Sequence, residues 1–406
     1  MPKLEIMFSE NFFDLVLNFG DDWKVTNVEL NTKKMEVDVY VEYQPYDKTI
    51  VNIYDSAPLR RWRHLDTMQY KTFINCRLPR VKDEFGKVTT LKAPWADTYQ
   101  RHTYLFERLA IDILKGTKNQ TKTAEILRCG FNVINKIIHS SVNRGLALRP
   151  KNFAYKHLSI DEKSFKKGHK YVTVLSSPIA GLVIDVAEDR NTESCKELLT
   201  KAISKENLSK VETVSMDMWK PYMNTVNSIL PDSKIVHDRF HLVQYLNKAI
   251  DAVRRREVKQ HELLKNSRYA FLKNPENLTE KQRIKFEEIS NANYEISRAW
   301  RIKENFRAIF GCSSLIEASG LIIKWLTFVS NTNIKEMTKV SQIFKNHLPG
   351  VINAMIESFS NAMAERLNGK IQEVKSTGRG YRKFENFRSA ILFFHGGLSL
   401  YPLSSQ

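Results

Sequence analysis

Cysteine is scarce in this sequence and is scattered along it. The 406 residues contain four cysteines, at positions 76, 129, 195 and 312, and no two of them form a Cys-x-x-Cys pair. This spacing argues against a disulfide framework and against a paired-cysteine zinc site, and isolated thiols are typical of a reducing compartment. We therefore expect no zinc.

Long apolar runs are missing as well. The best apolar stretch, residues 321–330, is interrupted by Lys324 and is far shorter than the roughly 20 residues that a membrane helix needs. The N-terminal residues lack the layout of a signal peptide, and there is no internal repeat or low-complexity tract. The sequence therefore predicts a cytoplasmic protein with no membrane partner.

Acidic residues are outnumbered by basic ones. The chain has 63 Lys and Arg against 45 Asp and Glu, which gives a net charge of +18 and a pI of about 9.5. An excess of this size favours a polyanionic partner, because cations that neutralise phosphates release condensed counterions. Charge alone is equally compatible with DNA, RNA, a ribosome or a membrane surface. The length predicts about two to four domains.

Residues 1–100 are predicted to form a β-rich region. Residues 35–43 alternate between apolar and polar side chains, the pattern of a strand with one wet face. A basic cluster around a tryptophan follows at 60–64. It is either a solvated edge strand or a phosphate contact, in which case Arg61 and Arg63 bind DNA.

Residues 101–150 turn to a helical pattern. Helices are expected at 106–115, 121–127 and 131–140, with Thr121 or Thr123 capping the second and a turn at 128–130. Two short helices around a glycine-containing turn resemble a helix-turn-helix, in which the second helix of the pair reads the DNA major groove. An ordinary helical hairpin gives the same pattern. In the helix-turn-helix reading, the residues facing DNA are Asn132, Asn135, Lys136 and His139.

Residues 155–240 alternate strands and helices. Strands are expected at 157–161, 171–175, 181–186, 211–216 and 234–237, and helices at 192–202 and 219–229. Three strands, then helix, strand, helix, strand is the order of an RNase H-like α/β domain. This fold class rests on element order alone, which is weaker evidence than a site.

The remaining chain is predicted to be helical. Residues 241–350 read as an all-α insertion into the α/β domain, which then closes with helices in 351–395. We expect one long helix over 351–375, opened by Gly350, and a last helix over 384–394. The basic run 254–256 is either a solvated helix face or a DNA contact.

Three acidic residues carry the predicted chemistry. Asp161 and Asp217 close apolar runs that read as strands, and Glu365 lies in a helical pattern. Carboxylates that converge in this way hold two Mg²⁺ ions for phosphodiester chemistry, with Mn²⁺ able to replace them. A strand-end aspartate is also a common turn or cap residue, and Glu357 and Glu373 share the predicted helix with Glu365.

Further residues flank this predicted site. Lys370 and Lys375 follow Glu365 and are placed to bind neighbouring phosphates. Asp238 and His241 are three positions apart just after the last strand, so they share one face of a helical turn. They either support the metal ligands from behind, or Asp238 is simply a helix N-cap.

Taken together, these stretches resemble the ISL-three family of bacterial insertion-sequence transposases, which belong to the DDE group. The similarity spans roughly residues 55–395 and is carried by the motifs at 60–66, 160–171, 214–219, 238–241, 360–371 and 380–388. The resemblance implies that Asp161, Asp217 and Glu365 form the metal-binding triad. It also implies a helical insertion between the last two of them, and a match of Asp238 and His241 to an Asp-x-x-His signature.

The sequence departs from the family at its zinc ribbon. Family members typically carry paired cysteines there, whereas the corresponding part of this chain, at about 55–95, has none at 80–86. Hydrophobic packing alone is then expected to hold this degenerate ribbon.

The resulting prediction is a bacterial DNA transposase. It binds terminal inverted repeats and target DNA, cleaves DNA with divalent metal ions and transfers the freed strand. Bringing two element ends together implies a homodimer on DNA. The alternatives are a catalytically inactive or domesticated transposase acting as a DNA-binding regulator, and a simple RNase H-like nuclease that cuts without joining.

Overall fold

The computed structural model describes residues 2–45, 52–150, 153–166, 168, 170–357 and 361–403, with side chains described from Glu10 in the first range and from Arg366 in the last. The chain divides into two compact units. One contains the residues up to Arg149 together with the segment from Leu398, and the other runs from Pro150 to Gly397. Within the described ranges, no helix is long and apolar enough to cross a membrane.

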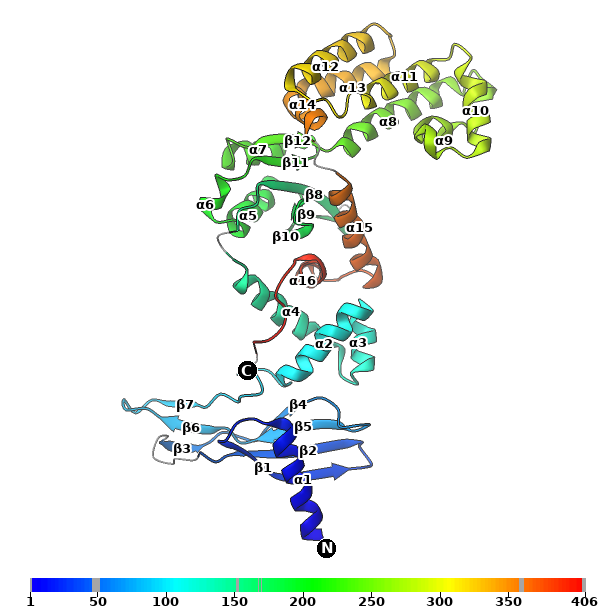
Figure 1. Ribbon diagram of the computed structural model, residues 1–406. Coiled ribbons are helices and arrows are strands. Elements are labelled where there is room, and N and C mark those ends of the chain that lie inside the picture. The colour runs from blue at the N-terminus through cyan, green and yellow to red at the C-terminus, as the bar shows by residue number, and fades with distance from the viewer. Residues whose placement is uncertain are drawn as a thin grey trace. The chain divides into compact units, whose positions relative to one another are not determined.

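The first unit opens with a helix and a four-stranded sheet (Figure 1). Helix α1 (Pro2–Leu17) precedes strands β1 (Trp23–Asn31) and β2 (Glu36–Tyr43), and β4 (Arg60–Arg63) and β5 (Lys71–Cys76) complete the sheet in the order β1-β2-β5-β4. The β-rich expectation for this region is met, but the strand pattern gave no sign of α1. Three tryptophans pack together in its core: Trp23 of β1, Trp62 of β4, and Trp95, which follows the strands in the chain.

A three-stranded sheet of β3 (Ile53–Ser56), β6 (Pro79–Lys82) and β7 (Val88–Thr90) occupies the region where the family's zinc ribbon is expected. Polar contacts hold it, in addition to packing. Arg80 forms an ion pair with Asp55, and Asp83 Oδ1 accepts hydrogen bonds from the backbone N–H groups of Phe85 and Lys87. The expectation of hydrophobic packing alone is therefore corrected.

Three helices complete the first unit: α2 (Tyr104–Thr117), α3 (Gln120–Ile126) and α4 (Phe131–Leu148). Asn119, rather than a threonine, caps α3, because its side chain accepts a hydrogen bond from the backbone N–H of Lys122. Arg128 adopts a left-handed conformation, with φ of 51°, in the turn before α4. Helix α4 extends eight residues beyond its expected end at 140.

The second unit contains a five-stranded mixed sheet. Its strands are β8 (His157–Lys166), β9 (Lys170–Ser177), β10 (Leu182–Glu188), β11 (Thr213–Met216) and β12 (Lys234–His237), in the order β10-β9-β8-β11-β12. The first three pair antiparallel, whereas β11 runs parallel to both β8 and β12. The predicted strand sequence is therefore present, and β8 is twice as long as the five residues expected for it.

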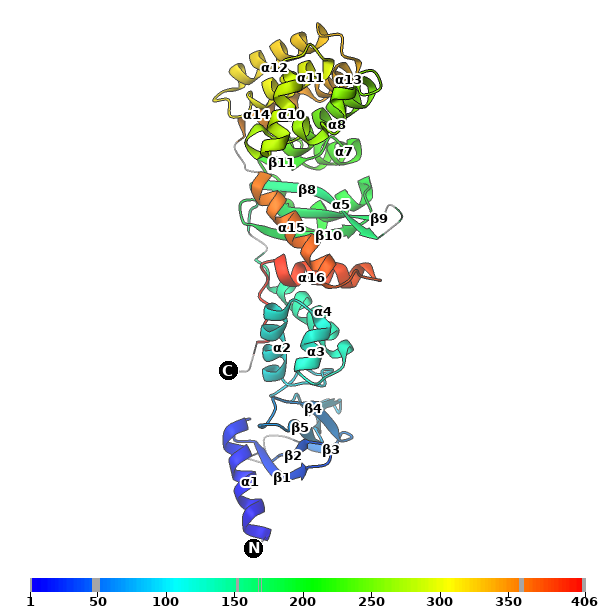
Figure 2. The same cartoon turned by 90° about the vertical axis from the view of Figure 1, so that its right-hand side faces the viewer.

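Helices cover both faces of this sheet. Helices α5 (Thr192–Ala202) and α7 (Lys220–Ile229), linked by way of the short α6 (Lys205–Leu208), pack into one core with Leu158, Ile160, Val214 and Met216 of the strands. On the opposite face, Phe387 of α16 (Phe384–His395) stacks on Phe165 of β8 at 5.5 Å between ring centroids. Helix α15 (Asn361–Thr377) contacts α16 and lies beside β8 in both views (Figures 1 and 2).

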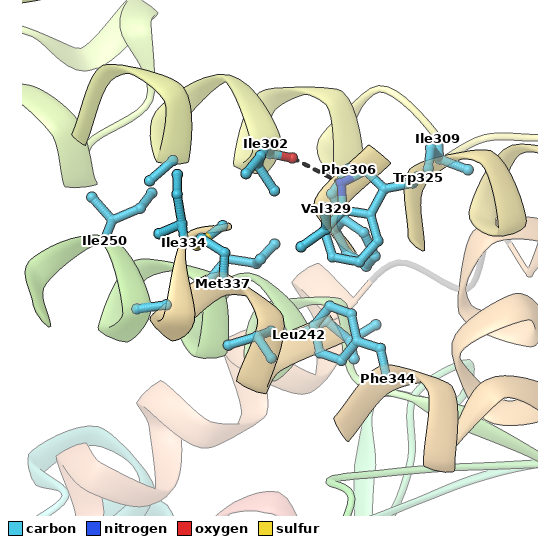
Figure 3. Packing of buried hydrophobic residues seen from close by; sticks show 14 of the residues in the cluster. Leu242, Ile250, Ile302, Phe306, Ile309, Trp325, Val329, Ile334, Met337 and Phe344 are labelled. Carbon is cyan, nitrogen blue, oxygen red and sulfur yellow. Dashed lines mark hydrogen bonds between the residues drawn. The ribbon is translucent and has the colours of Figure 1, made fainter. Parts of the chain in front are cut away.

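A helical region follows β12. It consists of α8 (Arg239–Glu257), α9 (Arg268–Leu272), α10 (Glu280–Ser290), α11 (Glu295–Arg307), α12 (Leu315–Ser330), α13 (Lys335–Asn346) and α14 (Leu348–Ile356), with two 3-10 turns at Glu262–Leu264 and Pro275–Asn277. Figure 3 shows its core, in which Phe306, Trp325 and Phe344 pack together and Trp325 Nε1 donates a 2.9 Å hydrogen bond to the Ile302 carbonyl.

The end of this region corrects one prediction. A single helix over 351–375 is wrong, because α14 ends at Ile356 and α15 begins at Asn361. Gly350 lies inside α14 and opens no helix. It is required there by close packing on β12, since a Cβ at this position would be 2.5 Å from the His237 ring.

Candidate active site

The register of two parallel strands brings the two predicted aspartates level with each other. Thr213, Val214 and Ser215 of β11 pair with His157, Leu158 and Ser159 of β8. Continuing this register by two residues sets Asp217 opposite Asp161. The sequence analysis made Asp161 the end of its strand, but it lies in the interior of β8 and pairs with Val174 of β9.

Strand alternation turns both carboxylates toward the same face of the sheet. Successive side chains point to opposite faces. Leu158, Ile160, Val214 and Met216 enter the core beneath α5 and α7. The intervening Asp161 and, at the strand end, Asp217 therefore belong to the other face, the one along which α15 lies.

Asp161 is held by two donors on that face. Its Oδ2 atom accepts a 2.6 Å hydrogen bond from Asn368 Nδ2 of α15 and lies 3.1 Å from the Lys163 ammonium. Three residues further along β8, the Ser164 carbonyl accepts a 2.6 Å hydrogen bond from Lys375 Nζ of α15. These contacts attach α15 to β8 beside Asp161. Lys375, which was predicted to bind phosphate, contacts the protein backbone in this structure.

Asp217 has fewer polar contacts than Asp161. Its Oδ1 atom accepts a 2.7 Å hydrogen bond from the backbone N–H of Met218, which fixes the carboxylate at the strand end. It has no ion-pair partner within the described part of the chain. Asp217 is half-buried, so its negative charge is only partly solvated.

Glu162, to which the sequence analysis assigned no role, interacts electrostatically with both aspartates. It points to the opposite face, where it pairs with Arg190, whose guanidinium stacks over the Trp219 ring at 4.2 Å. Burial raises the pKa of the Glu162 carboxyl, Arg190 opposes this, and the charges of Asp161 and Asp217 raise the pKa further. The charges of both aspartates therefore act on the Glu162 carboxyl from across the sheet.

Glu365, the third predicted ligand, belongs to α15, but its side chain lies outside the described residues. It precedes Asn368 by three positions, and residues at this spacing share a helix face. The same spacing in the sequence was a usable signal for Asn368, which the sequence analysis quoted within a motif without assigning it a role. Lys370, also predicted to bind phosphate, is half-buried further along the helix.

The predicted Asp238 and His241 pair lies at the start of α8. Asp238 is the N-cap, since its side chain accepts a 2.7 Å hydrogen bond from the Phe240 N–H, and its own N–H donates to the Met216 carbonyl. His241 is close enough to Glu162 to lower the pKa of that carboxyl. Asp238 therefore has the N-cap role, and its supporting role behind the metal ligands stays a prediction.

The predicted DNA-facing residues of α4 lie on its outer side. Asn132 and Lys136 are exposed, and Asn135 and His139 are half-exposed. Lys136 Nζ donates to the Tyr99 carbonyl at 3.3 Å.

The two predicted arginines of β4 are occupied by carboxylates of the protein. Arg61 Nε and a terminal nitrogen bind Asp38 and Glu36 at 2.8 and 2.9 Å. Arg63 is 8% exposed and pairs with Asp66. A phosphate contact by Arg63 from the open surface is not supported, because its guanidinium is buried among partners of its own.

Comparisons with known proteins identify the family of this chain. A family model described as a transposase (DDE_Tnp_ISL3) matches residues 158–391, more than half of the chain, and this match defines the class of protein. The chain belongs to the ISL-three family of transposases.

Two of its relatives are also named as transposases. It is 26% identical over 355 residues to the transposase for insertion sequence element IS1557 of Mycobacterium tuberculosis, covering 80% of this chain and 79% of the relative. It is 23% identical over 340 residues to the transposase for IS1001 of Bordetella parapertussis, covering 81% and 82%. A further match, 34% over 62 residues, is to an ATP-dependent protease of Lactococcus lactis and covers only 15% of this chain.

Proposed function

We propose that this transposase cleaves the ends of its insertion sequence and joins them to target DNA at a metal-dependent site formed by Asp161, Asp217 and Glu365. The observation that carries the proposal is the pairing of β8 with β11, which sets two aspartates level on one face of the sheet beside α15.

The fold of the second unit supports this reading. Strand order β10-β9-β8-β11-β12, with three antiparallel strands followed by two parallel ones, is consistent with an RNase H-like core. In such a core the middle strand and its parallel neighbour carry the first two carboxylates. The helices from α8 to α14 then form the insertion that separates Asp217 from Glu365.

The residues fit a hard divalent cation. Among the described residues, no three His, Cys, Asp or Glu side chains are grouped closely enough to hold a metal. Glu365, whose side chain lies outside those residues, is the third carboxylate of the proposal. The donors are carboxylate oxygens, which suit Mg²⁺ and Mn²⁺ rather than zinc. The Lys163 ammonium, 3.1 Å from Asp161 Oδ2, shows that positive charge is favourable beside this carboxylate.

The chain's own residues have distinct tasks in the reaction. Asp161 and Asp217 hold the cations, which when bound polarise the phosphodiester and lower the pKa of the attacking water. Asn368 orients the Asp161 carboxylate. Water attacks the phosphorus at the element end and a 3′-hydroxyl leaves, and this hydroxyl then attacks a target phosphodiester, so that one P–O bond forms as another breaks at each step.

DNA binding is assigned to the first unit. We propose that α3 and α4 form a helix-turn-helix in which Asn132, Asn135, Lys136 and His139 face the terminal inverted repeats. The support is the short turn at 127–130 between the helices and the exposure of Asn132 and Lys136. A homodimer on DNA remains part of the proposal, because two ends must be joined.

The test is cleavage and joining of a labelled duplex that carries the element's own ends. Wild-type protein with Mg²⁺ is expected to cut and to join, and Asp217→Asn is expected to bind the ends without cutting them. Cutting without joining points to a nuclease. Binding with no cutting by wild type, in Mg²⁺ and in Mn²⁺, overturns the catalytic proposal and leaves a DNA-binding regulator.

A further inference from the structure

A pocket of about 440 Å³ lies in the first unit, at the start of α4. Its walls come from β4 and β5, from the loop before α2, and from the turn and first residues of α4. The residues that line it are Arg63, Lys71, Phe73, Gln100, Arg101, His102, Arg128, Cys129, Asn132, Val133 and Lys136. The volume is within the usual range for a small-ligand site, roughly 300–1,000 Å³.

Two buried polar atoms in the pocket's lining residues have no partner. Gln100 Oε1 and Arg63 Nε are both inaccessible to solvent, and neither has a hydrogen-bond partner among the described residues. A buried polar group without a partner costs free energy, so such a group in a native structure calls for an explanation. Here one atom accepts and the other donates, a combination that a flat heterocycle with both kinds of edge group satisfies.

The rest of the lining suits an aromatic ring that carries a phosphate. Phe73 and Val133 supply apolar surface, and Arg61 already stacks on the Phe73 ring at 3.4 Å. Arg101 and Lys136 are exposed cations of the same pocket. Aromatic side chains that stack on bases, with cations that follow the backbone, are how proteins bind unpaired nucleotides.

We propose that this pocket receives one unpaired nucleotide of the DNA strand bound along α4. Its base packs on Phe73, the base edge bonds Gln100 Oε1 and Arg63 Nε, and its phosphate meets Arg101 and Lys136. The proposal rests on the proposed function, because Asn132 and Lys136 belong both to the pocket and to the DNA-facing side of α4. It goes beyond that function by adding recognition of a nucleotide extruded from the duplex.

Cys129 provides a reporter inside the pocket. It lines the pocket and is half-exposed, whereas Cys76, Cys195 and Cys312 are buried. Alkylation of the full-length chain by N-ethylmaleimide, followed by mass spectrometry, therefore measures access to the pocket. Burial raises the pKa of the Cys129 thiol, so the reaction is run at mildly alkaline pH.

Three duplexes of the terminal-repeat sequence serve as probes: one fully paired, one with a single unpaired nucleotide, and one with an abasic residue in place of that nucleotide. The unpaired nucleotide is expected to protect Cys129 at about tenfold lower DNA concentration than the abasic probe, the effect of one stacked base. Gln100→Leu removes the acceptor for the base edge and is expected to reduce this difference, while stacking on Phe73 keeps part of it. Gln120→Leu is the matched control, since Gln120 Oε1 is likewise buried and unpartnered but lies outside the pocket lining.

Other outcomes overturn the proposal in distinguishable ways. Equal protection by all three duplexes means that the pocket senses only the DNA backbone. Protection by free deoxynucleoside monophosphates but by no duplex means a site for a free nucleotide. Unprotected Cys129 in a complex that still shows DNA binding by fluorescence anisotropy rejects the pocket and leaves the proposed function intact, whereas loss of DNA binding altogether rejects both.

Discussion

The two large sheets of this protein differ in how their charged side chains are paired. In the four-stranded sheet of the first unit, Arg61 and Lys71 both pair with Glu36, and Arg61 also binds Asp38. In the five-stranded sheet of the second unit, the register of β8 and β11, continued by two residues, sets Asp217 opposite Asp161 on one face. The first sheet pairs Arg61 and Lys71 with carboxylates, whereas the second brings two carboxylates to one face, of which Asp161 pairs with Lys163 and Asp217 has no ion-pair partner among the described residues.

This difference has a physical meaning. Like charges directly opposite each other on neighbouring strands destabilise a sheet, so a sequence that keeps them gives up stability at that point. Such a cost is typical of functional sites, where groups are arranged for chemistry and not for folding. Asp185 of β10 shows that the second sheet also contains ordinary pairs, because it binds Arg388 of α16 at 2.8 Å.

The largest effect is expected on the rate of DNA cleavage, from a substitution of Glu365. If Glu365 is the third carboxylate, Glu365→Gln should lower the rate of end cleavage at least about 10³-fold, equivalent to about 4 kcal/mol of barrier. Glu373→Gln, an exposed glutamate of the same helix, should cut at the wild-type rate. Single-turnover cleavage with Mg²⁺ measures both, and equal rates for the two variants would reject Glu365.

The next effect concerns a buried histidine beside the first sheet. Burial, with the neighbouring Arg63 charge, lowers the pKa of His64 to about 4. Above pH 6.5 the imidazole is neutral in both states. Below pH 6.5, His64 binds a proton in the unfolded chain but stays neutral in the folded chain. The free energy of unfolding therefore decreases as pH falls toward 4, by up to about 3 kcal/mol.

Urea unfolding at pH 7 and pH 5 checks this assignment. Wild type should lose stability between the two pH values, and His64→Gln should lose less. Part of the loss should remain, because burial also lowers the pKa of His237 in the second unit to about 4. An unchanged pH slope in His64→Gln would show that His64 is not responsible.

A smaller effect is expected where α14 supports the second sheet. Gly350→Ala places a methyl group 2.5 Å from the His237 ring, so α14 must move away from β12 at a cost of about 1–3 kcal/mol. Gly320→Ala in α12 meets nothing within 4 Å and should stabilise the chain by up to about 1 kcal/mol. Thermal melting distinguishes them, and melting shifts of the same sign would refute the close packing.

The smallest effect separates paired from available cations in the first unit. Arg61→Gln breaks a half-exposed pair and should cost at most about 1 kcal/mol, with no change in the salt dependence of DNA binding. Lys136→Gln should reduce the slope of log affinity against log salt by about 1, because one phosphate contact is lost. A reduced slope in Arg61→Gln would restore that arginine to the DNA-binding surface.

Local patterns in the sequence identified most elements of the second unit. Helix 192–202 and strand 234–237 have the expected bounds, because alternation and helical periodicity are strong there. The break between α14 and α15 was not visible, since no glycine or proline marks it. The position of Asp161 within β8 was also missed, because the polar residues after it do not look like a strand.

The candidate site was predictable only in part, for a related reason. Motifs identified Asp161 and Asp217, but their common face follows from the register of β8 and β11, a long-range property that local patterns do not encode. The roles of Glu162 and Asn368 depend on contacts with Arg190 and Asp161, which are far away in sequence. The capping of α8 by Asp238 was one of two possibilities in the sequence and is visible only in the structure.

The most direct test of the contrast between the two kinds of charge measures melting temperature and end cleavage for Asp217→Asn and Asp185→Asn. Both changes remove one carboxylate charge from the same sheet, but only Asp185 has an arginine partner. We predict that Asp217→Asn melts at or above the wild-type temperature and does not cleave, whereas Asp185→Asn melts lower and still cleaves. Cleavage by Asp217→Asn at the wild-type rate would contradict the assignment of this face as the active site.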